Sequence, residues 1–271
     1  MRMSAKKVAI ITGASSGIGE ACAYAFANAG YHVVIAARNM QKLEQVKQQC
    51  ENLGAKALAL SCDVSVEADC LALINKSIDA FGRIDVLINN AGITMRALLA
   101  DLDLAVLKRV MDINFWGTVY CTRFAIAELI KNKGSVIGVS SIAGIKGLPG
   151  RTGYSASKFA MNGFLESLRV ENLKTGLHVG VICPGYTSSN IRNNALNADG
   201  RAQAESPFDE SKLMPAETVA EEVLQMVARR KHKVVLTKAG KLTYWLNKFF
   251  PRWVDKQVFK VVSAEKDSPF K

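Results

Sequence analysis

Short apolar runs recur along the chain, and each is followed by a polar or glycine-containing turn. Between these runs lie segments with the spacing of amphipathic helices. Repeated alternation of strand and helix predicts an α/β fold with a doubly wound, parallel, seven-stranded sheet covered by helices on both faces. The predicted strands are Val8–Ile11, His32–Ala37, Ala57–Cys62, Asp85–Ile88, Ser135–Ser140, Val179–Cys183 and Lys233–Thr237.

Polar residues and glycines follow several of these strands at their carboxyl ends. Right-handed crossovers bring such ends to one edge of a parallel sheet. We therefore expect the glycine turn after the first strand to share a crevice with Asp63, Asn90, Ser141 and Pro184. A helix is predicted from Asp103 to Lys131. The polar stretch 186–213 is predicted to be a substrate loop, because long loops in such domains usually carry function.

The charge of the chain is unevenly distributed. Of a net charge of +11 over 271 residues, the segment 229–271 contributes +9, with 12 Lys/Arg against 3 Asp/Glu. A nearly neutral domain with a basic tail does not have the character of a nucleic-acid-binding fold, so we expect no nucleic-acid partner. We assign 1–240 to one catalytic domain and 241–271 to a basic, amphipathic, helical C-terminal extension.

The six cysteines and three histidines show no metal-ligand spacing. Most of the cysteines fall within apolar runs, which predicts reduced thiols in the core and a cytoplasmic protein without a metal site. The sequence before Val8 has no apolar signal-peptide region, and no uncharged apolar run is long enough to span a membrane.

The first strand leads into a glycine-rich turn, Thr12–Gly19, and then into an Ala-rich helix. Strand, glycine turn and helix together direct backbone N–H groups and a helix N-terminus at a phosphate. The glycines follow the spacing G-x-x-x-G-x-G, which differs from the common dinucleotide fingerprint. A P-loop would also require a Gly-Lys-Ser/Thr sequence that is absent here.

Tyr154 and Lys158 are four residues apart, so on a helix their side chains lie on one face. An ammonium group close to a phenol favours the phenolate and lowers the pKa of the tyrosine, which would prepare Tyr154 for acid–base chemistry. Ser141 ends an apolar run thirteen residues before Tyr154. Its hydroxyl could hold a substrate oxygen against the Tyr154 phenol.

One motif also fits a different enzyme class. Gly13-Ala14-Ser15-Ser16-Gly17 matches the G-x-S-x-G nucleophile elbow of hydrolases, with His178 or His232 as the candidate base. The motif follows the first strand, however, and the chain lacks a His-Gly-Gly oxyanion segment. The hydrolase is therefore the weaker hypothesis.

Seven short motifs occur in a fixed order: T-G-x-x-x-G-x-G at 12–19, D-V at 63–64, N-N-A-G at 89–92, N-F-W-G at 114–117, V-S-S at 139–141, Y-x-x-x-K at 154–158 and P-G at 184–185. With these motifs in this order, the chain resembles the short-chain dehydrogenase/reductase family. The resemblance extends from about Lys7 to Thr237. It implies a Rossmann-like fold and an oxidoreductase that uses a nicotinamide cofactor.

The resemblance implies catalytic roles for Asn114, Ser141, Tyr154 and Lys158. Tyr154 would exchange a proton with the substrate oxygen, and Ser141 would orient that oxygen. Lys158 would bind the nicotinamide ribose and lower the pKa of Tyr154, while Asn114 would hold a water connected to Lys158. Ser140 is the neighbouring candidate for the role of Ser141. Without the resemblance, Asn114 is equally well explained as a mid-helix residue that bonds to backbone.

The cofactor-binding residues implied by the resemblance are Gly13, Ser15, Ser16, Gly17, Ile18, Gly19, Arg38, Asn39, Asp63, Val64, Asn90, Ala91, Gly92, Tyr154, Lys158, Pro184, Gly185 and Thr187. Arg38 follows Ala36-Ala37, where an NAD-selecting carboxylate would be expected, so we predict NADP(H). In the alternative interpretation, Arg38 is a surface residue, Asp63 only caps a helix and Asn90–Gly92 form a plain turn.

The expected reaction moves a hydride between nicotinamide and a carbonyl or secondary alcohol on a small molecule. Apolar residues in the expected substrate segments, among them Leu98, Ile142 and Leu196, favour a lipophilic ketone such as a steroid, a retinoid or a long-chain lipid like 3-ketosphinganine. Two alternatives stay open. One is a 3-oxoacyl-carrier-protein-type reductase, and the other is a catalytically silent NADPH-binding sensor or scaffold protein.

The C-terminal extension contains an apolar stripe, Leu242, Trp245, Leu246 and Phe249, at helical spacing. Pro251 interrupts the stripe, and lysines and arginines fill other positions in 241–260. This pattern fits either packing on the domain or on a sister subunit, or peripheral contact with an anionic membrane. A homodimer or homotetramer is expected.

Overall fold

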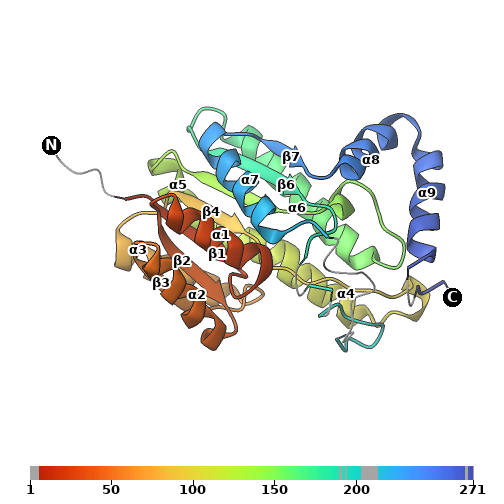
Figure 1. The fold of residues 1–271 in the computed structure, drawn as a ribbon, viewed down its shortest axis with the longest axis horizontal. Coiled ribbons are helices and arrows are strands. Elements are labelled where there is room, and N and C mark those ends of the chain that lie inside the picture. The colour runs from red at the N-terminus through yellow and green to blue at the C-terminus, as the bar shows by residue number, and fades with distance from the viewer. Residues whose placement is uncertain (1–5, 189–190, 193, 203–212, 266–267, 271) are drawn as a thin grey trace.

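The computed structural model describes residues 6–188, 191–192, 194–202, 213–265 and 268–270. A seven-stranded sheet with the order β3-β2-β1-β4-β5-β6-β7 forms the middle layer, and every strand pair is parallel. The predicted doubly wound sheet is therefore confirmed (Figure 1). Its strands are β1 Val8–Thr12, β2 His32–Ala37, β3 Ala57–Ser61, β4 Val86–Asn89, β5 Ser135–Val139, β6 His178–Cys183 and β7 Lys233–Val235.

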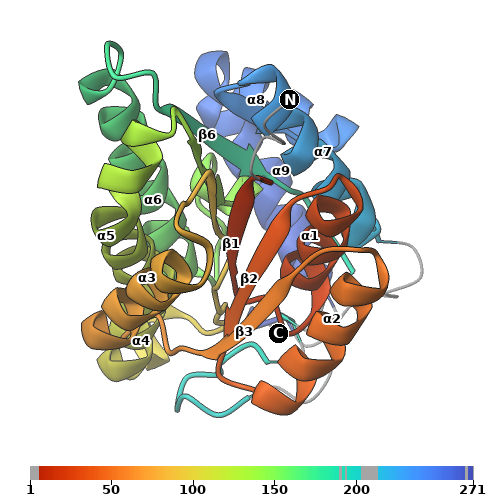
Figure 2. The ribbon, with the colours of Figure 1, turned by 90° about the vertical axis from the view of Figure 1, so that its left-hand side faces the viewer.

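Helices cover both faces of the sheet, as Figure 2 shows. One face carries α1 Gly17–Asn28, α2 Met40–Asn52 and α7 Ala216–Arg229. The other carries α3 Glu67–Phe81, α4 Leu104–Met111, α5 Gly117–Lys131 and α6 Thr152–Glu171. Short 3₁₀ turns follow β4 and β5 at Leu99–Asp101 and Ile142–Gly144, and α8 Lys238–Phe249 and α9 Pro251–Ser263 lie beyond β7.

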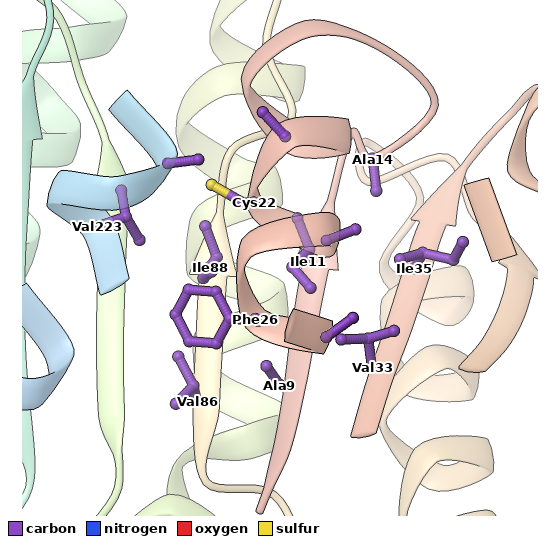
Figure 3. Packing of buried hydrophobic residues seen from close by; sticks show 14 of the residues in the cluster. Ala9, Ile11, Ala14, Cys22, Phe26, Val33, Ile35, Val86, Ile88 and Val223 are labelled. Carbon is purple, nitrogen blue, oxygen red and sulfur yellow. The ribbon is translucent and has the colours of Figure 1, made fainter. Parts of the chain in front are cut away.

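The core beneath α1 fixes the glycine turn to the sheet. Phe26 of α1 is fully buried and packs among the apolar side chains of β1, β2 and β4, including Val86 and Ile88 (Figure 3). A second apolar cluster fills the opposite face under α3, α5 and α6. All six cysteines are free and buried, in agreement with the prediction of core thiols.

The helix predicted from Asp103 to Lys131 is continuous from Leu104 to Lys131, but it contains a π turn that was not predicted. Helix α4 ends at Met111, a π-helical turn occupies Asp112–Trp116, and α5 begins at Gly117. Hydrogen bonds between the side chain of Asn114 and the backbone of Ile93 anchor this turn to the loop after β4. Single π turns of this kind are frequent at functional sites.

The C-terminal helices contact the domain through only part of their surface. Val254 and Val262 of α9 are buried, and Lys146 forms an ion pair with Asp255. The predicted stripe of α8 points largely outward, because Leu242, Trp245 and Phe249 are all exposed. The packing alternative therefore does not account for this stripe within the single chain.

Parts of two predicted regions lie outside the described residues, namely 189–190, 193 and 203–212 of the substrate loop and 266–267 and 271 of the extension. The division of the chain at residue 240 also stays a prediction. Of the helices that the structure describes, none has the length and apolar character needed to cross a membrane. Across the same residues, no group of three or more potential metal ligands occurs.

Replacing Phe26 by Ala should lower the free energy of unfolding by about 3–5 kcal/mol, because it leaves a cavity beneath α1. The matched control is Phe249→Ala on α8, where the side chain is 70% exposed and the loss should stay within about 0.5 kcal/mol. Urea denaturation measures both values. Equal losses in the two variants would contradict the packing described for α1.

Candidate active site

The turns after β1 and β4 are joined by hydrogen bonds. The Thr12 hydroxyl accepts from the amides of Asn90 and Ala91 at 3.0 and 3.1 Å. In return, the side-chain amide of Asn90 donates to the carbonyls of Thr12 and Gly13 at 2.9 and 3.2 Å. Gly13 has φ +66°, and a Cβ there would lie 2.8 Å from the Cα of Ala91. Only glycine fits this close approach.

A cavity of about 470 Å³ opens at the carboxyl edge of the sheet, where the strand order reverses between β1 and β4. This volume is within the usual range for small-molecule and cofactor sites. Twelve of the predicted cofactor residues line it: Gly13, Ser15, Ser16, Gly17, Ile18, Arg38, Asn39, Asp63, Val64, Asn90, Ala91 and Gly92. The glycine turn, Asp63 and Asn90 thus share one crevice as predicted, whereas Ser141 and Pro184 do not line it.

The cavity suits a dinucleotide phosphate because α1 begins at it. Ser16 precedes the first turn of α1 and makes no side-chain capping bond. The first amides of a helix lack partners within the helix, and they attract negative charge. Gly19 lies inside this turn, packed against the backbone of Gly13 and the side chain of Asn90.

Arg38, Asn39 and Asp63 form the far wall of the cavity. The Arg38 guanidinium is 60% exposed and lies 4.0 Å from a carboxylate oxygen of Asp63. Asn39 caps α2 by accepting from the Lys42 amide. Asp63 accepts from the amide and hydroxyl of Ser65 in a local turn, and α3 begins only at Glu67. Asp63 therefore is not a simple helix cap.

Several cavity residues were not among the predicted cofactor residues, although those beyond β6 fall within the predicted substrate loop. Arg109 of α4 contributes a second guanidinium, and Ile191, Asn194, Leu196 and Ala202 belong to the segment after β6. Arg109 resembles any exposed helical arginine in the sequence. The only available signal was its position one turn and a half before Asn114.

Tyr154, Lys158 and Ser141 meet beside this cavity. Tyr154 and Lys158 extend from the first two turns of α6, with the Lys158 Nζ 5.9 Å from the centre of the Tyr154 ring. The ammonium donates to the Val139 carbonyl at 2.9 Å. Ser141 follows β5 and accepts from the Ala143 amide at 3.1 Å, and hydrogen bonding by its side chain lowers the pKa of the Tyr154 phenol. The neighbouring Ser140 is buried and has no such effect on Tyr154.

Asn114 is fully buried between these residues and the loop after β4. Its side chain exchanges hydrogen bonds with the backbone of Ile93 and donates to the Ser157 hydroxyl at 2.9 Å. A Cβ on Gly92 would lie 3.1 Å from the Asn114 carbonyl oxygen and 3.5 Å from the Lys158 Nζ. Gly92 therefore separates the two side chains, and the backbone-bonding interpretation of Asn114 describes its contacts here.

Pro184, Gly185 and Thr187 follow β6 on the other side of Ser141. The Pro184 carbonyl accepts from the Ile142 amide at 3.0 Å, and the Thr187 hydroxyl donates to the Gly185 carbonyl. Neither these three residues nor Tyr154 and Lys158 are among the described residues that line the large cavity. They lie next to the cavity, at the same carboxyl edge of the sheet.

Burial governs the protonation of Tyr154 and Lys158. It lowers the pKa of Lys158 to about 8 and raises the pKa of Tyr154 above its ordinary value. The hydrogen bond with Ser141 and the charges of Arg151 and Arg192 act in the opposite direction on Tyr154. The predicted fall in the Tyr154 pKa is thus wrong for this structure, because desolvation of the phenolate outweighs these effects.

The hydrolase alternative fails on geometry. Ser15 lies beyond the carboxyl end of β1, whereas His178 begins β6 and pairs with the start of β5. The His178 ring contacts the Ser135 hydroxyl and the Lys231 carbonyl, and His232 lies beside it. These histidines are at the opposite edge of the sheet and cannot activate Ser15.

A parallel sheet with a nucleotide-sized cavity at its switch point, and a Ser–Tyr–Lys cluster with a buried lysine beside it, is typical of a dinucleotide-dependent oxidoreductase. The family model described as short chain dehydrogenase matches residues 7–200. The chain therefore belongs to the short-chain dehydrogenase family, whose members bind NAD(P) and oxidise alcohols or reduce ketones of small molecules.

Relatives cover most of the chain. The 11-beta-hydroxysteroid dehydrogenase-like 4A of Arabidopsis thaliana is 38% identical over 250 residues, which are 90% of this chain and 81% of that protein. The mouse dehydrogenase/reductase SDR family member 7B is 34% identical over 235 residues, which are 85% and 73% of the two chains.

Solved structures share the fold at lower identity. A Burkholderia phymatum short-chain dehydrogenase/reductase in complex with NAD superimposes with a TM-score of 0.82 at 24% identity, over 93% of this chain and 96% of that one. A Thermococcus sibiricus alcohol dehydrogenase complexed with 5-hydroxy-NADP gives a TM-score of 0.76 at 23% identity, over 85% and 96%.

The lowered pKa of Lys158 makes stability depend on pH. This pKa is about 8 in the folded protein and 10.5 for an unburied lysine, so between these values the unfolded chain binds more protons. The free energy of unfolding of the wild type, relative to Lys158→Met, should therefore rise by a few kcal/mol as pH increases from about 8 to 10.5.

Urea denaturation across this pH range measures the difference. Lys174→Met, which removes an exposed lysine just beyond α6, serves as the control and should follow the wild type. Curves that run parallel for wild type and Lys158→Met would show that burial does not favour the neutral amine.

Proposed function

We propose that this protein is an NADP(H)-dependent oxidoreductase that reduces a lipophilic ketone, or oxidises the corresponding secondary alcohol. The observation that carries this proposal is the meeting of Tyr154, Ser141 and Lys158 beside the nucleotide-sized cavity. When bound, the nicotinamide cofactor would supply or accept the hydride. All other steps fall to side chains of the chain itself.

Tyr154 is the proposed proton donor. A tyrosine phenol is protonated at neutral pH, and burial raises the pKa of Tyr154 further, so the proton needed for donation to a carbonyl oxygen is present. Ser141 would hold that oxygen through its hydroxyl. Lys158 would bind the cofactor ribose and supply positive charge near the phenol, and Asn114 would fix the π turn beside Lys158.

Two guanidiniums support the choice of NADP(H). Arg38 and Arg109 both line the cavity, and β2 ends in Ala37 where an NAD-selecting carboxylate would stand. The 2′-phosphate of NADP would receive charge-assisted hydrogen bonds from these arginines. The Asp63 carboxylate lies 4.0 Å from the Arg38 guanidinium and partly balances its charge. At this distance the N–H groups of Arg38 stay available to a phosphate.

Apolar packing supports a lipophilic substrate. Tyr154 packs against a cluster that contains Met95, Val106 and Leu196. Ile142, Ile145 and Leu148 add apolar surface between Ser141 and α6. Several relatives are named for hydroxysteroids, which agrees with a steroid-like or long-chain lipid ketone.

A panel of ketones and alcohols that varies in chain length and ring number, followed by NADPH absorbance, tests the reaction. Turnover of steroid, retinoid or long-chain ketones is expected. Turnover restricted to 3-oxoacyl groups on carrier protein would favour that reductase instead. NADPH binding with no turnover of any compound would favour the sensor or scaffold protein.

Tyr154→Phe should retain its fold and its affinity for NADPH but lose several orders of magnitude in kcat, because the proton donor is gone. Lys158→Ala should be nearly as damaging and should also weaken NADPH binding. Steady-state kinetics and fluorescence titration with NADPH separate the two effects. Near-normal turnover by Tyr154→Phe would exclude the proposed mechanism.

The wild type should prefer NADPH over NADH. Ala37→Asp combined with Arg38→Ala should shift that preference toward NADH, because it removes a charge-assisted contact of about 1.5–3 kcal/mol, or roughly 10- to 150-fold in affinity. Arg169→Ala on α6 controls for loss of an arginine. Equal use of both cofactors by the wild type would show that Arg38 does not select NADP(H) and is only a surface residue.

The outer face of α8 and α9 supports peripheral contact with an anionic membrane. Leu242, Trp245, Phe249, Phe250, Trp253, Phe259 and Val261 are exposed. Exposed lysines and arginines flank them at 241, 248, 252, 256 and 260. Like charges oppose a second copy on this face, whereas anionic lipids attract it by about 1 kcal/mol for each basic residue. The expected homodimer or homotetramer would then use another surface.

Full-length protein should sediment with vesicles that contain phosphatidylserine, and the binding should weaken with added salt. Trp245→Ala with Phe249→Ala should reduce it at least tenfold. Phe159→Ala, which alters an exposed phenylalanine on α6, is the control. If the double variant instead changes the oligomeric state and vesicles bind neither protein, the face is a subunit interface.

A further inference from the structure

A carboxylate from the C-terminal segment is buried against the catalytic domain. The side chain of Glu265, just beyond α9, is only 2% exposed. One of its oxygens lies 2.9 Å from the Arg96 guanidinium and 2.8 Å from that of Arg151. The Tyr186 hydroxyl donates to the other oxygen at 3.2 Å.

The three partners of Glu265 come from segments around the catalytic end of the sheet. Arg96 follows β4, Arg151 is the residue before the first turn of α6, and Tyr186 follows β6. The backbones of these segments are also joined, since the Ala97 amide donates to the Gly150 carbonyl at 2.9 Å and the Arg96 amide to the Leu196 carbonyl at 2.8 Å. Glu265 therefore connects the C-terminal segment to all three sides of the expected substrate region.

The Arg151 contact is closest to the chemistry. The Arg151 carbonyl accepts from the Ser155 amide at 2.8 Å and so begins α6 three residues before Tyr154. Its guanidinium charge also lowers the pKa of the Tyr154 phenol. A carboxylate that binds the Arg151 guanidinium therefore fixes the start of α6. It also partly balances the positive charge near the Tyr154 phenol.

An ion-pair cluster buried to this extent is weak evidence for a role in stability. Removing two guanidiniums and a carboxylate from water is costly, and apolar side chains of similar volume often serve stability as well. The cost is repaid only when the geometry is held by several bonds. This argument favours a role in positioning over a purely structural role.

We propose that Glu265 is a positioning residue for the reaction: by binding Arg96 and Arg151 it fixes the start of α6 and balances the charge of Arg151 near Tyr154. The inference rests on the proposed function, because the phenol of Tyr154 is its target. It extends that function to a residue at the far end of the chain, which the family motifs do not include.

Other groups near Tyr154 are not themselves replaced in Glu265→Gln. They are Ser141 after β5, Lys158 on α6, Cys183 at the end of β6 and Arg192 in the segment beyond it. Arg192 donates to the Thr187 carbonyl at 2.7 Å. Arg151 both pairs with Glu265 and acts by its charge on the Tyr154 pKa, so we expect a change in that pKa to be transmitted through Arg151.

Glu265→Gln in the full-length protein is the test, with Asp255→Asn as control. Asp255 is also an acid of the C-terminal helices paired with a lysine, but its side chain is 61% exposed. In Glu265→Gln, kcat/KM for the ketone should fall by about 10- to 100-fold, because small misplacements of a catalytic group have effects of this size. The Kd of NADPH should stay within about twofold of the wild type.

The ionisation of Tyr154 gives a readout that needs no substrate. It is the difference in phenolate absorbance between each protein and its Tyr154→Phe counterpart. In Glu265→Gln the Tyr154 pKa should fall by about half a unit to one unit, because the Arg151 charge is no longer balanced. Glu265→Gln with Arg151→Gln removes the guanidinium together with its carboxylate partner, so its Tyr154 pKa should return toward the wild-type value while kcat/KM stays low.

Two results would overturn the proposal. One is a Tyr154 titration and kcat/KM in Glu265→Gln equal to those of Asp255→Asn. The other is a lower melting temperature with unchanged kcat/KM and Tyr154 titration, which would mark Glu265 as structural only. If Glu265→Gln does not fold, kcat/KM of the double variant is compared with that of the wild type and of Asp255→Asn. A wild type that turns over no ketone would refute the proposed function, and the titration would still decide the role of Glu265.

Discussion

The turns after β1 and β4 satisfy each other's hydrogen-bonding groups, and the site depends on this exchange. Thr12 accepts from two amides of the β4 turn, and Asn90 donates to two carbonyls of the β1 turn. The turns are consequently held so close that a side chain at Gly13 would collide with Ala91. The glycine turn and the start of α1 then line the cavity. The backbone of these two turns thus shapes the part of the cavity that suits a phosphate.

At the other end of the same edge of the sheet, burial sets the pKa values of two side chains. Lys158 and Tyr154 both lie where their charged forms are disfavoured, so the lysine loses its proton more easily than usual and the tyrosine less easily. The π turn at Asn114 contributes by geometry rather than charge. It brings a side-chain amide to the Ile93 backbone and so joins α4 and α5 to the loop that carries Gly92.

The fold and most of the nucleotide end could be predicted from the sequence, because apolar runs define strands and topology brings their carboxyl ends together. Asp63 and Asn90 needed no further information to be placed at the cavity. The π turn could not be predicted, since it depends on a bond from Asn114 to a separate loop. Glu265 gave no local signal, because its partner Arg151 is 114 residues away. For α8, periodicity identified an apolar face but could not tell which way that face points.

The exchange of hydrogen bonds between Thr12 and Asn90 also has a consequence for how the protein acquires its function in time. These residues are 78 positions apart, and β2, β3 and their helices lie between them in the sequence. The bonds therefore form only when β4 pairs with β1. Contacts of such long range are slow to form. A folding intermediate that contains β1 and α1 alone would have the glycines but not their partner turn. The onset of nucleotide affinity during refolding would therefore mark the moment at which the centre of the sheet closes.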